Sequence, residues 1–136
     1  MNFIKNFTLI AFAALTMVAC NSDDDNNEKQ QTNQELLIGN FKITSISFNG
    51  ENEPFEDCYG LTTISFTPTN INATAYEGDN CEELYTESTL YVATENTITV
   101  GSGNEANTID YTITKETLIT TDRDGSDVYS ETYTRI

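Results

Sequence analysis

The chain has 136 residues, with 22 acidic and 6 basic side chains, a formal charge of −16 at neutral pH and no histidine. Such a charge repels phosphate backbones, so nucleic-acid binding is excluded. Without histidine the chain has no Ser-His or Cys-His pair to activate a nucleophile. In so acidic a chain, pairs of carboxylates arise by chance. We therefore expect a protein that is not an enzyme and has no catalytic residues.

Residues 1–19 have the pattern of a secretory signal peptide. Lys5 supplies an early positive charge, and Phe7–Val18 is an uncharged, mostly apolar run that is too short to span a bilayer. Met17-Val18-Ala19-Cys20 resembles the bacterial lipobox, in which the signal peptide is cut just before an acylated cysteine. This resemblance implies that Cys20 carries acyl chains such as palmitate and anchors the mature protein to a membrane.

Residues 20–35 are predicted to be a flexible linker, because no apolar side chain occurs between Cys20 and Leu36. Asp23-Asp24-Asp25 lies almost directly after the cysteine and resembles the acidic export signal of surface lipoproteins in the Bacteroidetes group. The alternative is a solvated spacer, which is what most charge runs are. The export signal implies a lipid-anchored protein of the outer membrane that is exposed at the cell surface.

Residues 36–136 are expected to form one small all-β domain. Threonine alternates with apolar residues, which is typical of strands, and no segment has a convincing helical period. The connections are too short for crossover helices, so we predict an antiparallel eight-stranded up-and-down barrel. The predicted strands are Ile38–Phe48, Leu61–Thr67, Ile71–Tyr76, Leu84–Ala93, Thr97–Val100, Thr108–Thr114, Thr117–Thr121 and Val128–Arg135.

Cys58 and Cys81 are expected to form a disulfide, as is usual for paired cysteines in an exported protein. If Thr69-Asn70 is a two-residue hairpin loop, Ile64 pairs with Ala75. Continuing this register brings Cys58 opposite Cys81, near the open end of the hairpin.

Alternating strand direction sorts the connections into two ends of the predicted barrel. Short turns at 68–70, 94–96 and 115–116 share one end with the start of the domain. The longer connections, at 49–60, 77–83, 101–107 and 122–127, share the other end. The tether therefore enters at the short-turn end, and the long loops are expected to face away from the membrane.

Two short motifs resemble those of lipocalin-like proteins. Gly39-Asn40-Phe41 is similar to the Gly-x-Trp of lipocalins, and Tyr133-Thr134-Arg135 is similar to the closing Tyr-x-Arg of lipocalin-like lipoproteins in Bacteroidetes. The resemblance implies a lipocalin-like barrel in which Arg135 packs over Phe41 and closes the barrel through a cation–π contact. The alternative is that Phe41 is an ordinary core residue and Arg135 a surface charge.

The segment from Asp122 to Asp127 invites a calcium interpretation. It does not fit the EF-hand template, and Asp-Gly between two strands is first of all a hairpin turn. A calcium site of another type on Asp122, Asp124 and Asp127 stays open as an alternative. No other cofactor is expected.

Twelve acidic residues fall in the four longer connections and form a predicted negative rim. Ala73 and Ala75 are predicted to face inward and leave room, with Val100 also inside. One hypothesis is a monomeric, non-catalytic binding module that holds a small apolar or cationic ligand at the long-loop end. Its apolar wall is predicted to be Phe55, Tyr59 and Tyr76. The alternative is a surface interaction or structural module with a solid barrel and calcium-assisted acidic loops.

Overall fold

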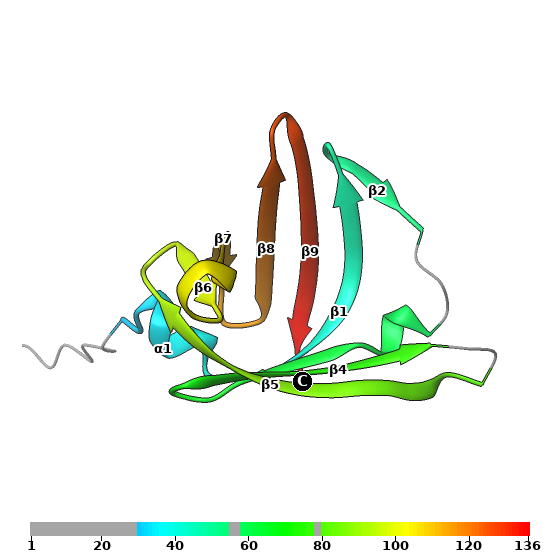
Figure 1. Cartoon of the computed structure of the whole chain (residues 1–136), viewed down its shortest axis with the longest axis horizontal. Coiled ribbons are helices and arrows are strands. Elements are labelled where there is room, and N and C mark those ends of the chain that lie inside the picture. The colour runs from blue at the N-terminus through cyan, green and yellow to red at the C-terminus, as the bar shows by residue number, and fades with distance from the viewer. Residues whose placement is uncertain (1–29, 55–57, 78–79) are drawn as a thin grey trace, which may run out of the picture.

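The computed structural model describes residues 30–54, 58–77 and 80–136 (Figure 1). It contains one antiparallel sheet that closes on itself. The sheet order is β2-β1-β3-β4-β5-β6-β7-β8-β9, and β1 also pairs with β9. The eight-stranded barrel predicted from the sequence is confirmed, with β2 as an additional strand. The strands are β1 (Gly39–Phe48), β2 (Glu51–Glu53), β3 (Thr63–Phe66), β4 (Asn70–Glu77), β5 (Glu82–Ala93), β6 (Thr97–Val100), β7 (Asn107–Ile113), β8 (Thr117–Asp124) and β9 (Asp127–Arg135).

We call the end of the barrel that carries the short β5–β6 and β7–β8 turns its base. The barrel is closed at this base and opens toward the other end. The first residues of β1, Gly39–Lys42, pair with β3, whereas the last, Ile46–Phe48, pair with β2. In the described part of the chain, β5 pairs with β6 only over its last three residues, Tyr91–Ala93, although β5 begins at Glu82. The long β4–β5 hairpin therefore diverges from the strands β8, β9 and β1 (Figure 1).

A short helix, α1 (Asn33–Leu37), covers the base next to the turn between β5 and β6 (Figure 1). Thr32 caps it: the Glu35 amide donates to the Thr32 hydroxyl, and the Thr32 amide donates to the Glu35 carboxylate. The sequence analysis predicted no helix and placed the end of the linker at residue 35, inside α1. Five residues are too few to display a helical period. No helix in the described ranges combines the length and the apolar character needed to cross a membrane.

The core fills the lower part of the barrel. Phe66 contacts the rings of both Phe41 and Tyr91 edge to face, with centroids 6.1 and 5.2 Å apart. Leu37 of α1 is fully buried and closes this core from below. The buried apolar residues of the cluster are Leu37, Phe41, Ile43, Ile64, Phe66, Ile98, Tyr111, Leu118 and Tyr133.

The predicted register of the β3–β4 hairpin is wrong by two residues. Ile64 pairs with Ala73 instead of Ala75, because the turn is formed around Pro68. The amide of Thr67 donates to the carbonyl of Asn70, and the Thr67 hydroxyl accepts from the Asn70 amide. Pro68 has no amide hydrogen to donate to a ladder, which favours its place in the turn.

Two connections also differ from the prediction. Residues 122–127 were predicted as a long loop, but β8 and β9 continue to the pair Asp124–Asp127 and leave a two-residue turn. After β1, Asn49 and Gly50 adopt φ values of 52° and 85° and form a tight turn into the unpredicted strand β2. Both φ values are positive, as the tight turns of hairpins require.

Candidate ligand-binding site

A cavity of about 530 Å³ lies inside the barrel beside β4, β5 and β6. Small-molecule sites typically have volumes of roughly 300–1,000 Å³. The cavity is therefore large enough for a small organic ligand. Its lining residues are Ile71, Ala73, Glu87, Thr89, Val100, Gly101, Ser102, Glu105 and Asn107.

The inner wall comes from paired positions on neighbouring strands. Ile71 pairs with Thr89, and Ala73 pairs with Glu87, across β4 and β5. Cross-strand partners share one face of a sheet, so all four side chains point into the barrel. Ile71, Ala73 and Val100 are half-buried, which makes the inner part of the cavity apolar.

The outer part of the cavity is acidic. Glu105 lies in the turn η2 (Gly103–Glu105) between β6 and β7, and the amide of Gly101 anchors this connection to the Leu90 carbonyl at 3.1 Å. Glu87 and Glu105 are both exposed, and none of the lining residues is basic. The site therefore offers carboxylates to a cation and repels an anion.

Two tyrosines support the wall of the cavity from the core. Tyr91 donates its hydroxyl to the Thr67 carbonyl at 2.8 Å, and burial raises its pKa. Tyr111 donates to the Thr94 carbonyl at 2.7 Å, and burial together with the charge of Glu95 raises its pKa to about 12. Both hydroxyls are therefore neutral and already hydrogen-bonded at neutral pH.

A carboxylate shared by two tyrosines fastens the loop after β2 to the barrel. Glu131 accepts hydrogen bonds from Tyr59 at 2.7 Å and from Tyr133 at 2.6 Å. Burial, and then the hydrogen bonds and charge of Glu131, raise the pKa of both tyrosines. Tyr59 belongs to the turn η1 (Tyr59–Leu61), so this contact holds η1 against β9.

The predicted apolar wall does not coincide with this cavity. Neither Tyr59 nor Tyr76 is among the lining residues. Tyr76 is half-buried near the end of β4, and Phe55 lies outside the described residues. The cavity instead uses Ala73 and Val100, which the alternation of the sequence placed inside the barrel.

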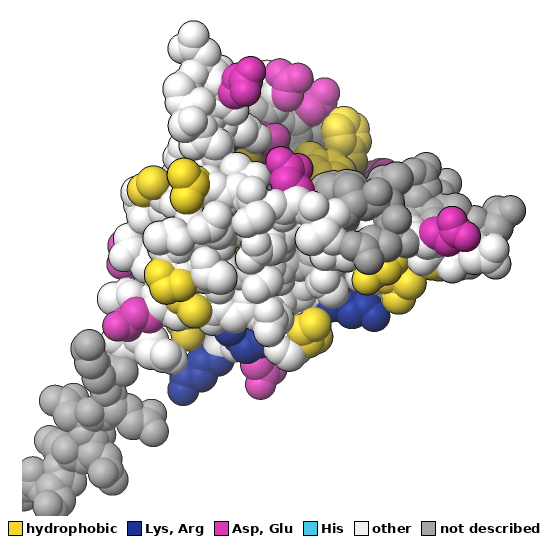
Figure 2. Space-filling model, turned by 60° about the horizontal axis from the view of Figure 1, so that its bottom comes forward, with side chains coloured by type: hydrophobic (Ala, Val, Ile, Leu, Met, Phe, Trp, Pro, Cys, Tyr) yellow, Lys and Arg dark blue, Asp and Glu magenta, His cyan; other side chains and the backbone are white. Residues whose placement is uncertain are grey.

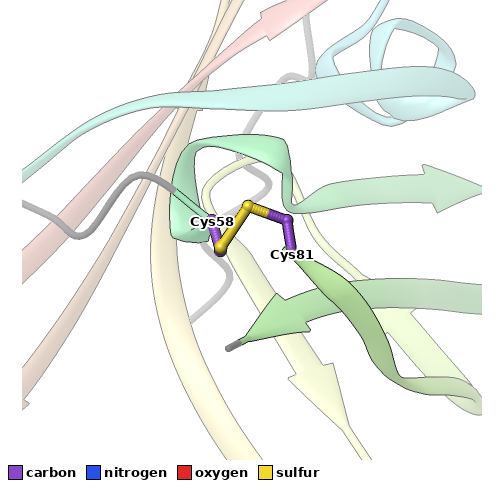
Figure 3. Close-up of a disulfide and its surroundings, with 2 residues drawn as sticks. All are labelled: Cys58 and Cys81. Atoms are coloured by element: carbon purple, nitrogen blue, oxygen red, sulfur yellow. A yellow bond between two sulfur atoms is a disulfide. The ribbon is translucent and has the colours of Figure 1, made fainter. Parts of the chain in front are cut away.

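The predicted disulfide between Cys58 and Cys81 is confirmed, with Cα atoms 4.9 Å apart (Figure 3). Cys58 directly precedes η1, and Cys81 directly precedes β5. The bridge therefore joins η1 to the β4–β5 hairpin at the long-loop end, although the ladder register used to predict it was wrong. Together with the Tyr59 contact, it connects β5, η1 and β9.

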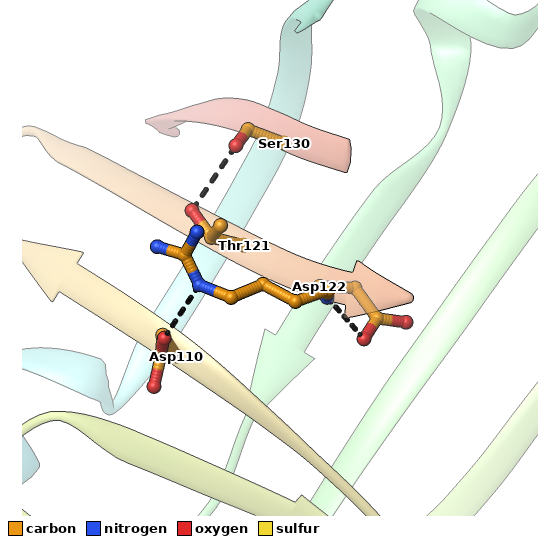
Figure 4. Close-up of polar contacts among 5 residues, drawn as sticks. Asp110, Thr121, Asp122 and Ser130 are labelled. Carbon is orange, nitrogen blue, oxygen red and sulfur yellow. Dashed lines mark hydrogen bonds and ion pairs between the residues drawn. The ribbon is translucent and has the colours of Figure 1, made fainter. Parts of the chain in front are cut away.

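The aspartates considered for calcium lie on the β8–β9 hairpin. Asp122 accepts from the neighbouring Arg123 amide at 2.8 Å, and Asp127 accepts from the Asn49 side chain at 3.3 Å. Figure 4 shows the Asp122 contact beside the pair formed by the hydroxyls of Thr121 and Ser130. Within the described residues, no group of three or more acidic or cysteine side chains is arranged to hold a metal ion.

The fold and the cavity define a β-barrel of the ligand-binding type. Residues 37–120 match the family model of the lipocalin-like domain, and the chain belongs to this family. The match extends from the end of α1 into β8 and includes every residue that lines the cavity. No curated protein and no solved structure is significantly similar to the chain.

Glu87 is the charged residue on the inner wall of the cavity, and the sequence analysis did not identify it. It lies within the predicted strand Leu84–Ala93, where an acidic side chain is normally assigned to the solvent face. Its position two residues before Thr89 and four before Tyr91 is the available signal, because residues two apart share a face.

Proposed function

We propose that the protein is a non-catalytic, lipid-anchored binding protein of the outer membrane, exposed at the cell surface. In this proposal the barrel binds a small apolar or cationic ligand in the cavity between β4, β5 and β6. The observation that carries the ligand class is the combination of an apolar inner wall with Glu87 and Glu105 at the outside. A ligand with an apolar body and a positively charged end complements both parts.

The position of the domain start supports an orientation in which the base of the barrel faces the membrane and the cavity faces away from it. α1 lies at the base, and its side chains Asn33 and Gln34 donate to the carbonyls of Glu95 and Ala93. The connection from β6 to β7, which carries Glu105, leaves from the other end of the strands. A lipid on Cys20 would therefore hold the base toward the membrane and leave the cavity accessible from outside.

The proposal is tested by titrating the purified protein with three lipophiles that share one alkyl chain and carry a cationic, a neutral or an anionic head group. Native mass spectrometry of the same preparation detects any ligand that co-purifies. We expect the cationic lipophile to bind most tightly. Preferred binding of the anionic lipophile would contradict the proposal.

Two variants assign the binding to the cavity. Replacing Glu87 and Glu105 with Gln should weaken binding of the cationic lipophile and leave the neutral one unchanged. Replacing Ala73 with Phe should fill the inner part and weaken both. The matched control is Glu116→Gln, which removes an exposed carboxylate from the turn between β7 and β8. If no lipophile binds the wild-type protein, a surface interaction module is the better explanation.

A further inference from the structure

Two exposed aromatic side chains lie directly opposite each other on β1 and β9. Phe48 and Tyr129 are paired in the β1–β9 ladder and are 43% and 39% exposed. Adjacent exposed aromatic side chains form a coherent apolar surface, whereas scattered ones need no explanation. This pair lies outside the cavity described above and shares no residue with it.

The pair extends the face of the sheet that packs on the core. Ile46, two residues before Phe48, packs against the core cluster. Glu131, two residues after Tyr129, accepts the hydrogen bonds of Tyr59 and Tyr133. Since residues two apart in a strand share a face, Phe48 and Tyr129 continue the inner face beyond the end of the core.

Each aromatic residue has a carboxylate as its other cross-strand neighbour. Glu51 of β2 pairs with Phe48, and Asp122 of β8 pairs with Tyr129. We call Glu51, Phe48, Tyr129 and Asp122 the acid–aromatic row. Directly paired residues have Cβ atoms roughly 4.5–5.5 Å apart, so the four side chains form a continuous line across four strands.

Further acids extend the same face along the strands. Glu53 pairs with the inward-facing Ile46, and Asp124 pairs with Asp127 at the tip of the β8–β9 hairpin. Figure 2 shows acidic side chains beside hydrophobic ones at the upper end of the molecule, with Lys and Arg side chains toward the lower end. The row is thus part of a wider negative surface.

The row is held in place by Asn49, in the turn between β1 and β2. The Asn49 side-chain oxygen accepts from the Val128 amide, and the Asn49 amide donates to the Val128 carbonyl, both at 2.8 Å. The Asn49 side-chain nitrogen donates to Asp127 at 3.3 Å. These bonds connect the β1–β2 and β8–β9 turns, so little ordering of the row is needed on binding.

The chain's own basic side chains do not neutralise the row in the described part of the structure. Arg123 follows Asp122 in β8, so it points to the opposite face, where it contacts Asp110 at 3.4 Å. Lys115 and Arg135 lie at the base, where the Arg135 side chain donates to the Lys115 carbonyl. Lys42 pairs with Thr63 and Thr134, near the base and on the outer face.

We propose that the acid–aromatic row is a docking surface for an extended, arginine- or lysine-rich segment of a partner protein. A guanidinium or ammonium group over Phe48 or Tyr129 gains a cation–π contact, and Glu51 and Asp122 lie at either side to pair with its charge. The surface is open and its acids continue over several positions. It therefore fits a chain of several basic residues better than one free small cation.

The test uses the full-length protein and a fluorescein-labelled hexa-arginine peptide, with binding followed by fluorescence anisotropy. Phe48→Leu and Tyr129→Leu keep an apolar side chain and remove the aromatic face. Each should weaken binding roughly 2- to 5-fold, which corresponds to an exposed cation–π contact. The controls are Leu90→Ser and Val92→Ser, which change apolar residues that are 61% and 70% exposed on β5. These controls should bind the peptide as the wild type does.

A second pair of variants separates local pairing from attraction by the net charge. Asp122→Asn should weaken binding more than Glu116→Gln, because both remove one charge but only Asp122 belongs to the row. Equal losses in these two variants, together with no loss in the two leucine variants, would overturn the proposal. Thermal unfolding verifies that each variant is folded.

Two further measurements distinguish a basic peptide from a small cation as the ligand, and the acid–aromatic row from the cavity as the binding site. Tetramethylammonium should not displace the peptide at concentrations comparable to that of the peptide; displacement would indicate a small-cation site and overturn the proposal. Ala73→Phe, which fills the cavity, should leave peptide binding unchanged. Loss of lipophile binding and loss of peptide binding can therefore be told apart.

Discussion

Arg135 lies over Phe41 across the β1–β9 ladder, with its guanidinium carbon 4.5 Å from the ring centroid. The same guanidinium donates to the carbonyls of Lys115, Ile38 and Leu36. One side chain therefore connects α1, the start of β1 and the turn between β7 and β8. This is the closing contact that the resemblance to lipocalin-like proteins implied.

Replacing Arg135 with Lys should lower the free energy of unfolding by roughly 2–3 kcal/mol, because a lysine cannot donate in three directions while lying over the ring. Urea unfolding measures the change. Arg123→Lys is the matched control, since the Arg123 side chain is 59% exposed and makes a surface ion pair. An effect of Arg135→Lys no larger than that of the control would contradict the closing role.

Replacing Gly39 with Ala should destabilise the protein through Arg135. Gly39 has a φ of +145°, and an added Cβ would collide with the Arg135 guanidinium. Gly103 also has positive φ, at +65°, but no atom lies within 4 Å of an added Cβ. We expect Gly39→Ala to cost about 1–3 kcal/mol more than Gly103→Ala in urea unfolding. In an Arg135→Ala background this difference should become smaller, and the remainder reflects the φ of Gly39, which L residues rarely adopt.

The Cys58–Cys81 bridge should make both cysteines inert to a thiol reagent in the denatured, unreduced protein. Peptide mapping by mass spectrometry identifies the labelled positions. Replacing both residues with Ser should lower the free energy of unfolding by roughly 3 kcal/mol, because a loop of 23 residues is no longer closed in the unfolded chain. Labelling of Cys58 and Cys81 without prior reduction would show that the bridge is absent.

Alkaline pH should destabilise the protein through its buried tyrosines. The pKa values of Tyr59, Tyr111 and Tyr133 are raised above 10.0 in the folded state. Above pH 10 the unfolded chain loses these protons while the folded chain keeps them. The stabilisation is therefore complete below pH 10 and is lost as the pH rises further.

Each tyrosine ionised only in the unfolded chain should contribute a slope of about −1.4 kcal/mol per pH unit. Urea unfolding between pH 8 and 11.5 measures the slope, and Tyr133→Phe should make it shallower above pH 10. A stability that stays constant up to pH 11 would refute this linkage.

The lipid anchor is tested by fractionating cells. Cys20→Ser should release the protein from membranes, because the acylated residue is removed. Replacing Asp23, Asp24 and Asp25 with Ala should leave the protein membrane-bound but shielded from external protease. A Cys20→Ser protein that still sediments with membranes would rule out the lipoprotein assignment.

The order of the strands and most of their positions followed from alternation and short connections, but the register of the β3–β4 hairpin did not. Thr97–Val100 has the predicted bounds because turn-forming residues lie on both sides of it. The β3–β4 hairpin was predicted two residues out of register. Such a shift leaves every side chain on the same face, so the hydrophobic pattern cannot detect it. The register is set by the turn instead, through Pro68 and through the Thr67 hydroxyl that accepts from the Asn70 amide.

The cavity was predictable only in part, because alternation assigns a side chain to a face of the sheet but does not show where that face borders a cavity. Ala73 and Val100 were identified because small and apolar residues in an alternating strand point inward. Glu87 was not, because its spacing from Thr89 and Tyr91 shows which face of β5 it shares with them but not that this face borders a cavity. β2 and the extended ends of β8 and β9 are rich in acidic residues, so their sequences resemble loops. The strand character of β2 comes from pairing with β1, and the extended ends of β8 and β9 pair with each other.

The base of the barrel also brings distant parts of the chain together. The amide of Ile136 donates to the Asn40 carbonyl at 3.0 Å, so the last described residue lies beside the first strand. A fluorescent reporter fused after Ile136 would hang from the same end as the N-terminal tether. It would leave both the cavity and the acid–aromatic row unobstructed, which makes this position the preferred attachment point for imaging or affinity capture in living cells.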